Sequence, residues 1–441
     1  MGSLTTNNNT ANTGLANARQ IPPPAPLITG PFELSINNSS SGAAYVGWTL
    51  SACSLRITDQ PQADRNVVLR NNTALGGQVI FRSTYTSVDQ NILLLTLPGD
   101  GSPVNFFVGG RFGSPSTEDQ DARISVVDNE TPTNTVLHQR TLMVRVRKNA
   151  NNLTVKERDL LLDAYAKVNA SGYQVFLDSH NAAASREIHA RPSFLPWHRA
   201  FLLSFERHLQ VVHPSVTVPY WHFDQPSPNI FSPDFMGGTP DSVGTVALSS
   251  TNPLTSWKVL GIPGIVRAPL FNTATSGAQS LEPALTPVRN ETSVLALGPG
   301  FIDFNDMEFD PHNSAHSSFS TGPLISPPTA TRDPLFFLLH CNIDRLWAKW
   351  QLARNLYNTS NINTYSPQPI PAIGDFLTDT MWPWNGVTTP PRPSTAPGGP
   401  LLQLAFPSKP GPVPTVADVI DYIGKTQGNS NYFDYDDVPF I

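Results

Sequence analysis

Short runs of alternating apolar and polar residues fill the chain from about residue 28 to residue 147. Such runs, when Gly, Asn, Asp and Pro bound them, are typical of half-buried β-strands. The candidate strands are FELSI, YVGWTL, NVVLR, QVIFRSTY, ILLLTL, NFFVGG, ARISVVD and TLMVRVR. Because they follow one another at fairly regular spacing with no long helix between them, we predict an all-β, sandwich-like domain over residues 28–147.

After residue 147 the apolar positions change to a helical period. Thr154 followed by Glu157 has the pattern of a capping box, and apolar residues then recur at helical spacing. We therefore predict a mainly helical domain over residues 148–441, and hence an α+β multidomain chain. Residues 365–415 are rich in Pro and Gly, which predicts an irregular wrap, and a short helix is expected at 415–423. Residues 1–27 are polar and predict a disordered tail.

Composition excludes several classes of protein. The chain has 441 residues, only 14% of them charged, and a net charge of −6 without a Lys/Arg cluster, so a nucleic-acid partner is not expected. No segment reaches the roughly 18 apolar residues of a membrane span. The N-terminus lacks the charged and apolar regions of a secretory signal, so we expect a soluble protein that is cytoplasmic by default. Two cysteines exclude a disulfide framework and a thiolate zinc site.

Most of the ten histidines gather in two clusters. The first cluster contains His180, His189 and His198, with His208 further along the same helix. His189 lies in a Pro-rich loop, His198 stands where an amphipathic helix is predicted to begin, and His180 ends the preceding helix. Three imidazoles thus come from three separate elements.

The second cluster contains His312, His316 and His340. His312 and His316 are four residues apart, so they share one face of a helix. His340 lies in an apolar run with helix-start signals, because Asp333 suits the N-cap and Pro334 the first helical position. A histidine inside a buried helix needs partners for its ring nitrogens, and a metal satisfies one of them. Asp344, one turn on, is a candidate for a residue that supports the site.

A single histidine on a helix is usually an ordinary core or surface residue, and an HxxxH pair alone is weak evidence for a metal. Two separate triads change that judgement. The chain has no HExxH arrangement of a zinc protease, and all-imidazole coordination suits copper, zinc or iron. Six neutral histidines, three for each ion, suit a copper pair that binds dioxygen, and burial favours the neutral form.

The stretches FLPWHRAFLLSFERHL, VPYWHFD, PHNSAH and DPLFFLLHCNIDRLW resemble the signatures of the tyrosinase family of type-3 copper proteins, over roughly residues 145–440. The resemblance implies a mainly helical fold with a central four-helix bundle that holds two copper ions. By motif, His180, His189 and His198 would bind one copper, called CuA. The corresponding CuB ligands would be His312, His316 and His340.

The resemblance also implies an activity. Such a dicopper oxidase uses O2 as co-substrate to hydroxylate monophenols in the ortho position and to oxidise o-diphenols to o-quinones. Glu308 and Asn313 match the family's residues that are proposed to hold a water for deprotonating the phenol, which is reasonable for a general base. The alternative for Glu308 is a surface acid near a helix N-terminus. Asn313 and Ser317 are expected to line the mouth of the pocket.

The chain also departs from the family pattern. Leu339 stands where most members have a first histidine, so His340 alone is assigned as the ligand. No cysteine lies near His189, so the thioether of some members is not expected, and Cys341 is interpreted as an inert core thiol. Phe433 and Tyr435 match a Tyr/Phe-x-Tyr motif whose usual partner would be Arg145 or Arg147.

Several alternatives stay open. The nearest is a catechol oxidase or o-aminophenol oxidase without efficient monophenol hydroxylation; a haemocyanin-like oxygen carrier and a β-sandwich binding protein with an incidental metal are further ones. We expect a phenolic small molecule as partner, no nucleic acid and no membrane, with a copper chaperone as a further candidate. The N-terminal β domain either packs on the bundle and partly covers the copper entrance, or serves solubility or assembly alone.

Overall fold

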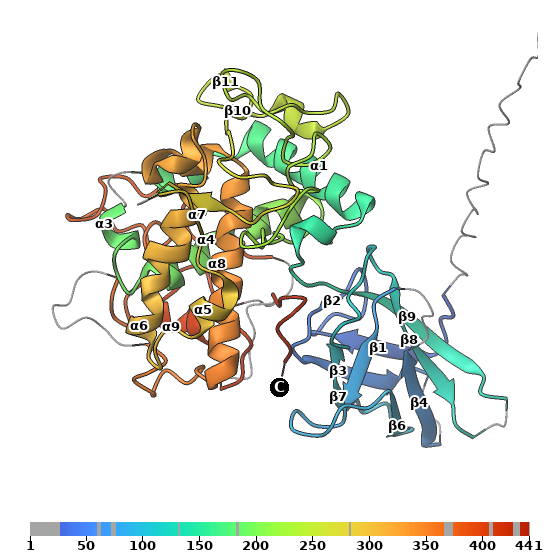
Figure 1. The fold of residues 1–441 in the computed structure, drawn as a ribbon. Coiled ribbons are helices and arrows are strands. Elements are labelled where there is room, and N and C mark those ends of the chain that lie inside the picture. Colours follow the sequence, from blue (N-terminus) through green and yellow to red (C-terminus); the bar gives the residue numbers. More distant parts are fainter. Residues whose placement is uncertain are drawn as a thin grey trace, which may run out of the picture.

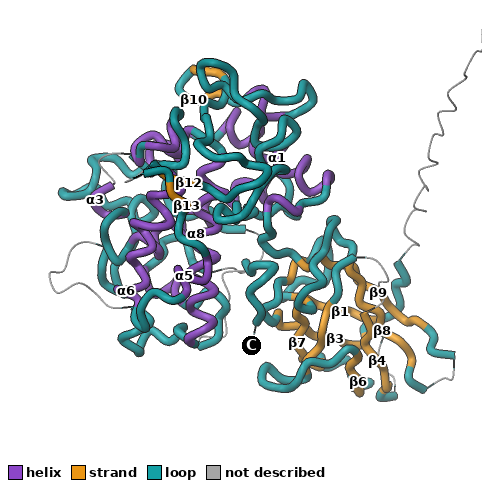
Figure 2. Tube along the Cα trace, viewed as in Figure 1, coloured by secondary structure: helices purple, strands orange, loops and turns teal. Residues whose placement is uncertain are grey.

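We analysed a computed structural model, which describes residues 27–59, 63–71, 76–130, 133–181, 185–281, 284–365, 374–404, 409–426 and 433–440. The predicted tail lies outside these residues except for Leu27, and so does Tyr432 of the C-terminal motif. Figure 1 shows a strand-rich part formed by the beginning of the chain and a helix-rich part formed by the remainder, and Figure 2 shows that long loops surround the helices.

The strand-rich part contains two sheets that share one hydrophobic core. One sheet has the strand order β1-β3-β7-β5 and the other β2-β9-β8-β4-β6. The strands are β1 (Phe32–Ile36), β2 (Tyr45–Val46), β3 (Ser51–Ile57), β4 (Arg65–Asn71), β5 (Val79–Arg82), β6 (Ile92–Leu97), β7 (Val104–Gly110), β8 (Ala122–Asp128) and β9 (Val136–Val144). Each predicted strand contains or overlaps an observed one. The sequence prediction missed β3, whose alternate residues are nevertheless buried.

The helix-rich part is built around two long helices, α4 and α8, which pack against each other. The helices are α1 (Val155–Ser171), α2 (Gln174–Ser179), α3 (Ser185–Ile188), α4 (Phe194–Val212), α5 (Glu291–Leu295), α6 (Phe301–Asn305), α7 (Ser314–His316), α8 (Leu335–Arg354) and α9 (Val416–Ile420). Two short hairpins pair β10 (Lys258–Val259) with β11 (Ile262–Pro263), and β12 (Gln279–Ser280) with β13 (Thr286–Pro287). Shorter helical turns are η1 (Ala150–Asn152), η2 (Pro253–Ser256), η3 (Asp306–Glu308), η4 (Phe309–Asn313), η5 (Pro323–Ile325) and η6 (Pro327–Arg332).

The helix-start signals are largely confirmed. Thr154 caps α1 in a capping box with Glu157, and Thr415 caps α9 in the same way with Asp418. Two predicted helix starts differ from the observed ones by one or a few residues. Helix α4 begins at Phe194, so His198 lies inside its first turns rather than at its start. Helix α8 begins at Leu335, with Asp333 accepting a hydrogen bond from the Leu335 N–H at 2.9 Å.

The sheets contact the helix-rich part through the linker after β9 and through the last described residues. The Trp48 indole donates a hydrogen bond to the Tyr435 carbonyl at 2.8 Å, and Asp434 accepts one from the Thr49 N–H at 3.1 Å. In Figure 1 the sheets lie on the side of the helix-rich part opposite α3. These contacts join the sheets to the C-terminal segment, and whether the sheets also cover a copper entrance stays a prediction.

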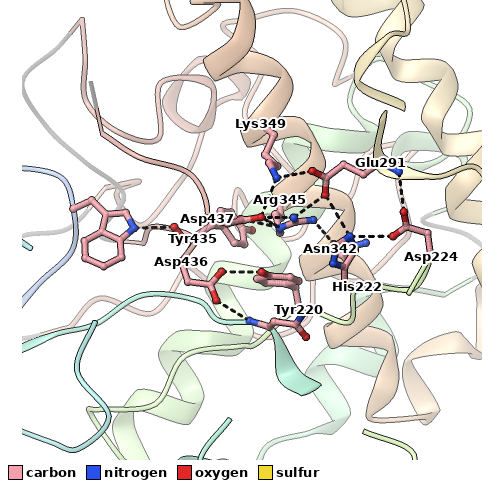
Figure 3. A network of polar contacts seen from close by, with 12 residues as sticks. Tyr220, His222, Asp224, Glu291, Asn342, Arg345, Lys349, Tyr435, Asp436 and Asp437 are labelled. Atoms are coloured by element: carbon pink, nitrogen blue, oxygen red, sulfur yellow. Dashed lines mark hydrogen bonds and ion pairs between the residues drawn. The ribbon is translucent and has the colours of Figure 1, made fainter. Parts of the chain in front are cut away.

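Charged side chains of α8 hold the C-terminal segment in place (Figure 3). Arg345 donates from Nε to both carboxylate oxygens of Asp437, at 2.9 and 3.0 Å, and its Nη2 lies 2.7 Å from Glu291. Lys349 also contacts Glu291 and Asp437. Among the described residues, no helix is long and apolar enough to cross a membrane.

Candidate metal centre

The fold brings the two predicted histidine triads together as two compact clusters. In each triad the candidate ligand atoms all lie within 4.8 Å of one another. One triad is His180, His189 and His198, and the other is His312, His316 and His340. Five of the six histidines are buried, and His189 is half-buried.

Different local structures position the six side chains. His180 is the C-cap of α2, and His198 and His340 project from α4 and α8. His189 lies in the loop between α3 and α4. His312 and His316 lie one turn apart on the helical segment of η4 and α7 that follows a kink at Asp310, where φ is −149° and ψ is 114°.

Four of the rings are oriented by backbone carbonyls. The Nδ1 atoms of His180, His198, His312 and His316 lie 2.9, 2.8, 3.0 and 2.8 Å from the carbonyl oxygens of Pro327, Phe194, Glu308 and Leu324. A carbonyl oxygen can only accept a hydrogen bond, so each Nδ1 carries the proton of a neutral ring. The Nε2 lone pair of each ring is therefore available to a metal.

Burial keeps all six imidazoles neutral. It lowers the pKa of His189 and of His316 to about 4. It also lowers the pKa of the other four histidines well below the ordinary value, and neighbouring imidazoles lower it further. Neutral imidazole is the form that binds a metal, so the buried environment favours ligation at neutral pH.

The spacing of the inward nitrogens fits a metal ion in each triad. Nε2 of His340 lies 3.3 Å from Nε2 of His312 and 3.1 Å from Nε2 of His316. Nε2 of His198 lies 3.4 Å from Nε2 of His180. Metal–imidazole bonds of about 2.0–2.1 Å place two ligand nitrogens of a tetrahedral site about 3.3 Å apart. Nε2 of His180 and Nε2 of His198 both lack a proton, so a shared cation explains their approach better than a hydrogen bond between them.

The two triads adjoin each other. The rings of His198 and His340, one from each triad, stack with their centroids 4.4 Å apart. Two phenylalanines that the sequence prediction missed also contact both triads. The Phe194 ring lies 4.7 Å from His198 and 4.8 Å from His312, and the Phe336 ring lies 4.1 Å from His340 and 4.9 Å from His180. Each phenylalanine precedes a histidine by four residues, a spacing that could have indicated them.

Glu308 is buried beside the centre, with only 3% of its surface exposed, so the alternative of a surface acid is wrong. Its Oε1 accepts a hydrogen bond at 2.6 Å from the N–H of Ala190, the residue directly after His189. Its Oε2 is buried without a hydrogen-bond partner in the described part of the chain. Burial raises the pKa of Glu308 to about 7. Asn313 is exposed, and its Oδ1 accepts from Nδ1 of His312 at 3.0 Å, whereas Ser317 is half-buried.

A buried polar network lies beneath the triads. Asp344 accepts hydrogen bonds from Arg199, Arg147 and the Tyr435 hydroxyl. Asp344 lies one turn beyond His340 on α8, and Arg199 directly follows His198 on α4, so this ion pair joins the two helices near the triads. Of the two predicted partners of Tyr435, Arg147 rather than Arg145 makes the contact. Cys341 is fully buried, and burial raises its thiol pKa, as expected for an inert core thiol.

Two adjoining sites, each with three neutral imidazoles and no ligating thiolate or carboxylate, define a paired-metal protein of the type that suits copper. Comparisons with known proteins agree. Residues 170–353 match the family model described as the common central domain of tyrosinase. A tyrosinase of Streptomyces antibioticus is 34% identical over 276 residues, which cover 55% of this chain and 94% of that protein.

Two more distant similarities complete the comparison. Hemocyanin 1 of Megathura crenulata is 28% identical over 241 residues, which are 49% of this chain and 7% of that protein. A solved structure of a polyphenol oxidase mutant from Thermothelomyces thermophila is 20% identical, with a TM-score of 0.41, and the match covers 66% of this chain and 88% of that one.

The chain belongs to the tyrosinase family. The family consists of dicopper oxidoreductases, and the two triads have the donor type, protonation state and spacing for two copper ions.

Proposed function

We propose that this protein is a dicopper oxidase that uses O2 to hydroxylate monophenols in the ortho position and to oxidise o-diphenols to o-quinones. The observation that carries the proposal is the pair of adjoining, buried, neutral imidazole triads. His180, His189 and His198 would hold CuA, and His312, His316 and His340 would hold CuB. The copper pair supplies the activation of dioxygen.

The chain's own residues provide the rest of the chemistry. Phe194 and Phe336 surround the imidazoles with aromatic surface and exclude water from them. Glu308 would hold a water through its unpartnered Oε2, and the carboxylate–water pair would take the proton of the phenol hydroxyl. Asn313 would orient this water while its Oδ1 fixes the His312 ring.

The test is oxygen uptake by the copper-loaded protein, with copper measured at two ions per chain, in the presence of a monophenol and, separately, the matching catechol. We expect uptake with both. Glu308→Gln should lower the monophenol rate about 10²- to 10⁴-fold, the usual contribution of a general base, while the catechol rate changes far less. Glu118→Gln, at an exposed carboxylate that pairs with Lys156, is the matched control. Equal losses with both substrates would contradict the role of Glu308.

Other outcomes would select the alternatives. Uptake with a catechol or an aminophenol alone would favour a catechol oxidase or o-aminophenol oxidase. Two bound coppers with reversible oxygen binding and no phenol turnover would favour an oxygen carrier, a class with some support from the similarity to a hemocyanin.

We also propose the finer organisation of the chain. The two sheets would form a sandwich-like domain over residues 28–147, and residues 148–441 would form the catalytic domain. Helices α4 and α8, which pack against each other, and α1, which packs against α4, would belong to a central four-helix bundle. The expected partner is a phenolic small molecule.

A further inference from the structure

His189 differs from the other five histidines in how it is held. It belongs to a loop and is half-buried, and its buried Nδ1, like that of His340, has no hydrogen-bond partner among the described residues. The next residue, Ala190, has φ +53°, in the left-handed region that side chains with a Cβ rarely adopt. No carbonyl among the described residues orients the His189 ring, and no long helix carries it as α8 carries His340. The position of the ring therefore depends on what fixes the backbone of this loop.

A buried ion pair lies two residues before His189. Glu187 receives two parallel hydrogen bonds from Arg392, Nε to Oε2 and Nη2 to Oε1, both at 2.9 Å. The two side chains are 9% and 7% exposed, so solvent screens the pair little. This forked geometry restrains direction as well as distance. Arg392 comes from the Pro-rich wrap, 205 residues later in the chain, where Nη2 also donates to the Thr380 carbonyl at 2.9 Å.

Further contacts restrain the backbone of the same loop on both sides of His189. The Ser193 hydroxyl donates to the Glu187 carbonyl at 2.6 Å, which closes the loop on itself. On the far side of His189, Glu308 accepts from the Ala190 N–H. A Cβ placed on Gly374, which has φ +93°, would lie 3.2 Å from Cγ of Glu187, so the wrap packs closely against this side chain.

We propose that the Glu187–Arg392 ion pair positions His189, so that retention of the CuA ion depends on the Pro-rich wrap. The inference rests on the proposed copper role of the triads. Glu187 and Arg392 are positioning residues: they act on the metal through the loop backbone. On the CuB side, His312, His316 and His340 are carried by helical turns, so we expect no comparable dependence on the wrap there.

The test follows copper release from the copper-loaded protein into excess chelator, measured as copper per chain against time. Arg392→Lys keeps the charge but loses the fork. We expect one copper per chain to leave about ten- to a hundredfold faster than in the wild type, as for other residues that support metal ligands, while the second leaves at the wild-type rate. Arg345→Lys breaks a comparable fork, in which Nε and Nη2 contact Asp437 of the C-terminal segment, and should leave both rates unchanged. Equal acceleration of both coppers, or of neither, would overturn the proposal.

A second variant separates positioning from a general loss of structure. His189→Ala should retain only the CuB ion, so adding Arg392→Lys to this background should leave the release rate of that remaining copper unchanged. Additional acceleration there would mean that the ion pair only stabilises the fold, and would overturn the proposal. A wild-type protein that never binds two coppers would instead contradict the proposed function itself, so the two failures are distinguishable.

Discussion

The two triads hold the same kind of ligand on different supports. His312, His316 and His340 come from helical turns, and the rings of His312 and His316 are fixed by carbonyls only four and eight residues away. His189 comes from a loop whose fixed points, Glu308 and Arg392, lie 118 residues from Ala190 and 205 residues from Glu187. Local backbone geometry therefore places His312 and His316, whereas the loop of His189 is held by contacts with segments distant in the sequence.

The largest effect should come from removing one ligand of each triad. His340→Ala and His189→Ala should each reduce copper from two ions to one per chain and bring oxygen uptake to background. Free imidazole in the buffer should restore copper binding in His189→Ala, because that site is half-buried, but not in His340→Ala, because His340 is only 1% exposed. The measurement is copper per chain with and without imidazole. Equal restoration of copper binding in both variants would contradict the proposed difference between the triads.

A smaller effect is expected from the aromatic ring that touches both triads. Phe336 is fully buried against His340 and His180, so Phe336→Ala should lower the free energy of unfolding by about 3–5 kcal/mol. Urea denaturation of the copper-free protein measures this, with Phe376→Ala, at a side chain that is 39% exposed, as the control. Because Phe336 contacts a ligand of each triad, both coppers should be released faster in this variant. Faster release of only one copper would argue against support of both sites by the Phe336 ring.

The smallest effect concerns the contact between the sheets and the C-terminal segment. Burial raises the pKa of Asp434 to about 7. The folded chain therefore holds this proton more tightly than the unfolded chain, where the pKa is about 3.9. The resulting stabilisation is fully present below about pH 4 and is lost as the pH rises through about 7.

Asp434→Asn imitates the protonated acid and should remove this dependence. Between pH 5 and pH 8 the wild type should lose a few kcal/mol of unfolding free energy relative to the variant. The difference between the two proteins is the relevant quantity, because the buried histidines titrate in the opposite sense over the same range. Parallel urea-denaturation curves at both pH values would show that Asp434 is ionised throughout.

The sequence predicted those parts of the structure that depend on residues close together in the chain, but not those that depend on the tertiary fold. The capping box at Thr154 and the four-residue spacing of His312 and His316 are local patterns, and both indicated structure that is present. Strand β3 was missed although Cys53, Leu55 and Ile57 alternate with polar residues, the pattern that predicted the other strands. The Glu187–Arg392 pair could not be predicted, because neither residue lies in a periodic segment and only the tertiary fold brings them together.

The most direct test of the dicopper centre is an anomalous-difference map at the copper absorption edge, from crystals of the copper-loaded protein. We predict two peaks, one bound by His180, His189 and His198 and the other by His312, His316 and His340. A single peak, or a peak bound by any other set of side chains, would contradict the assignment on which the proposed function depends.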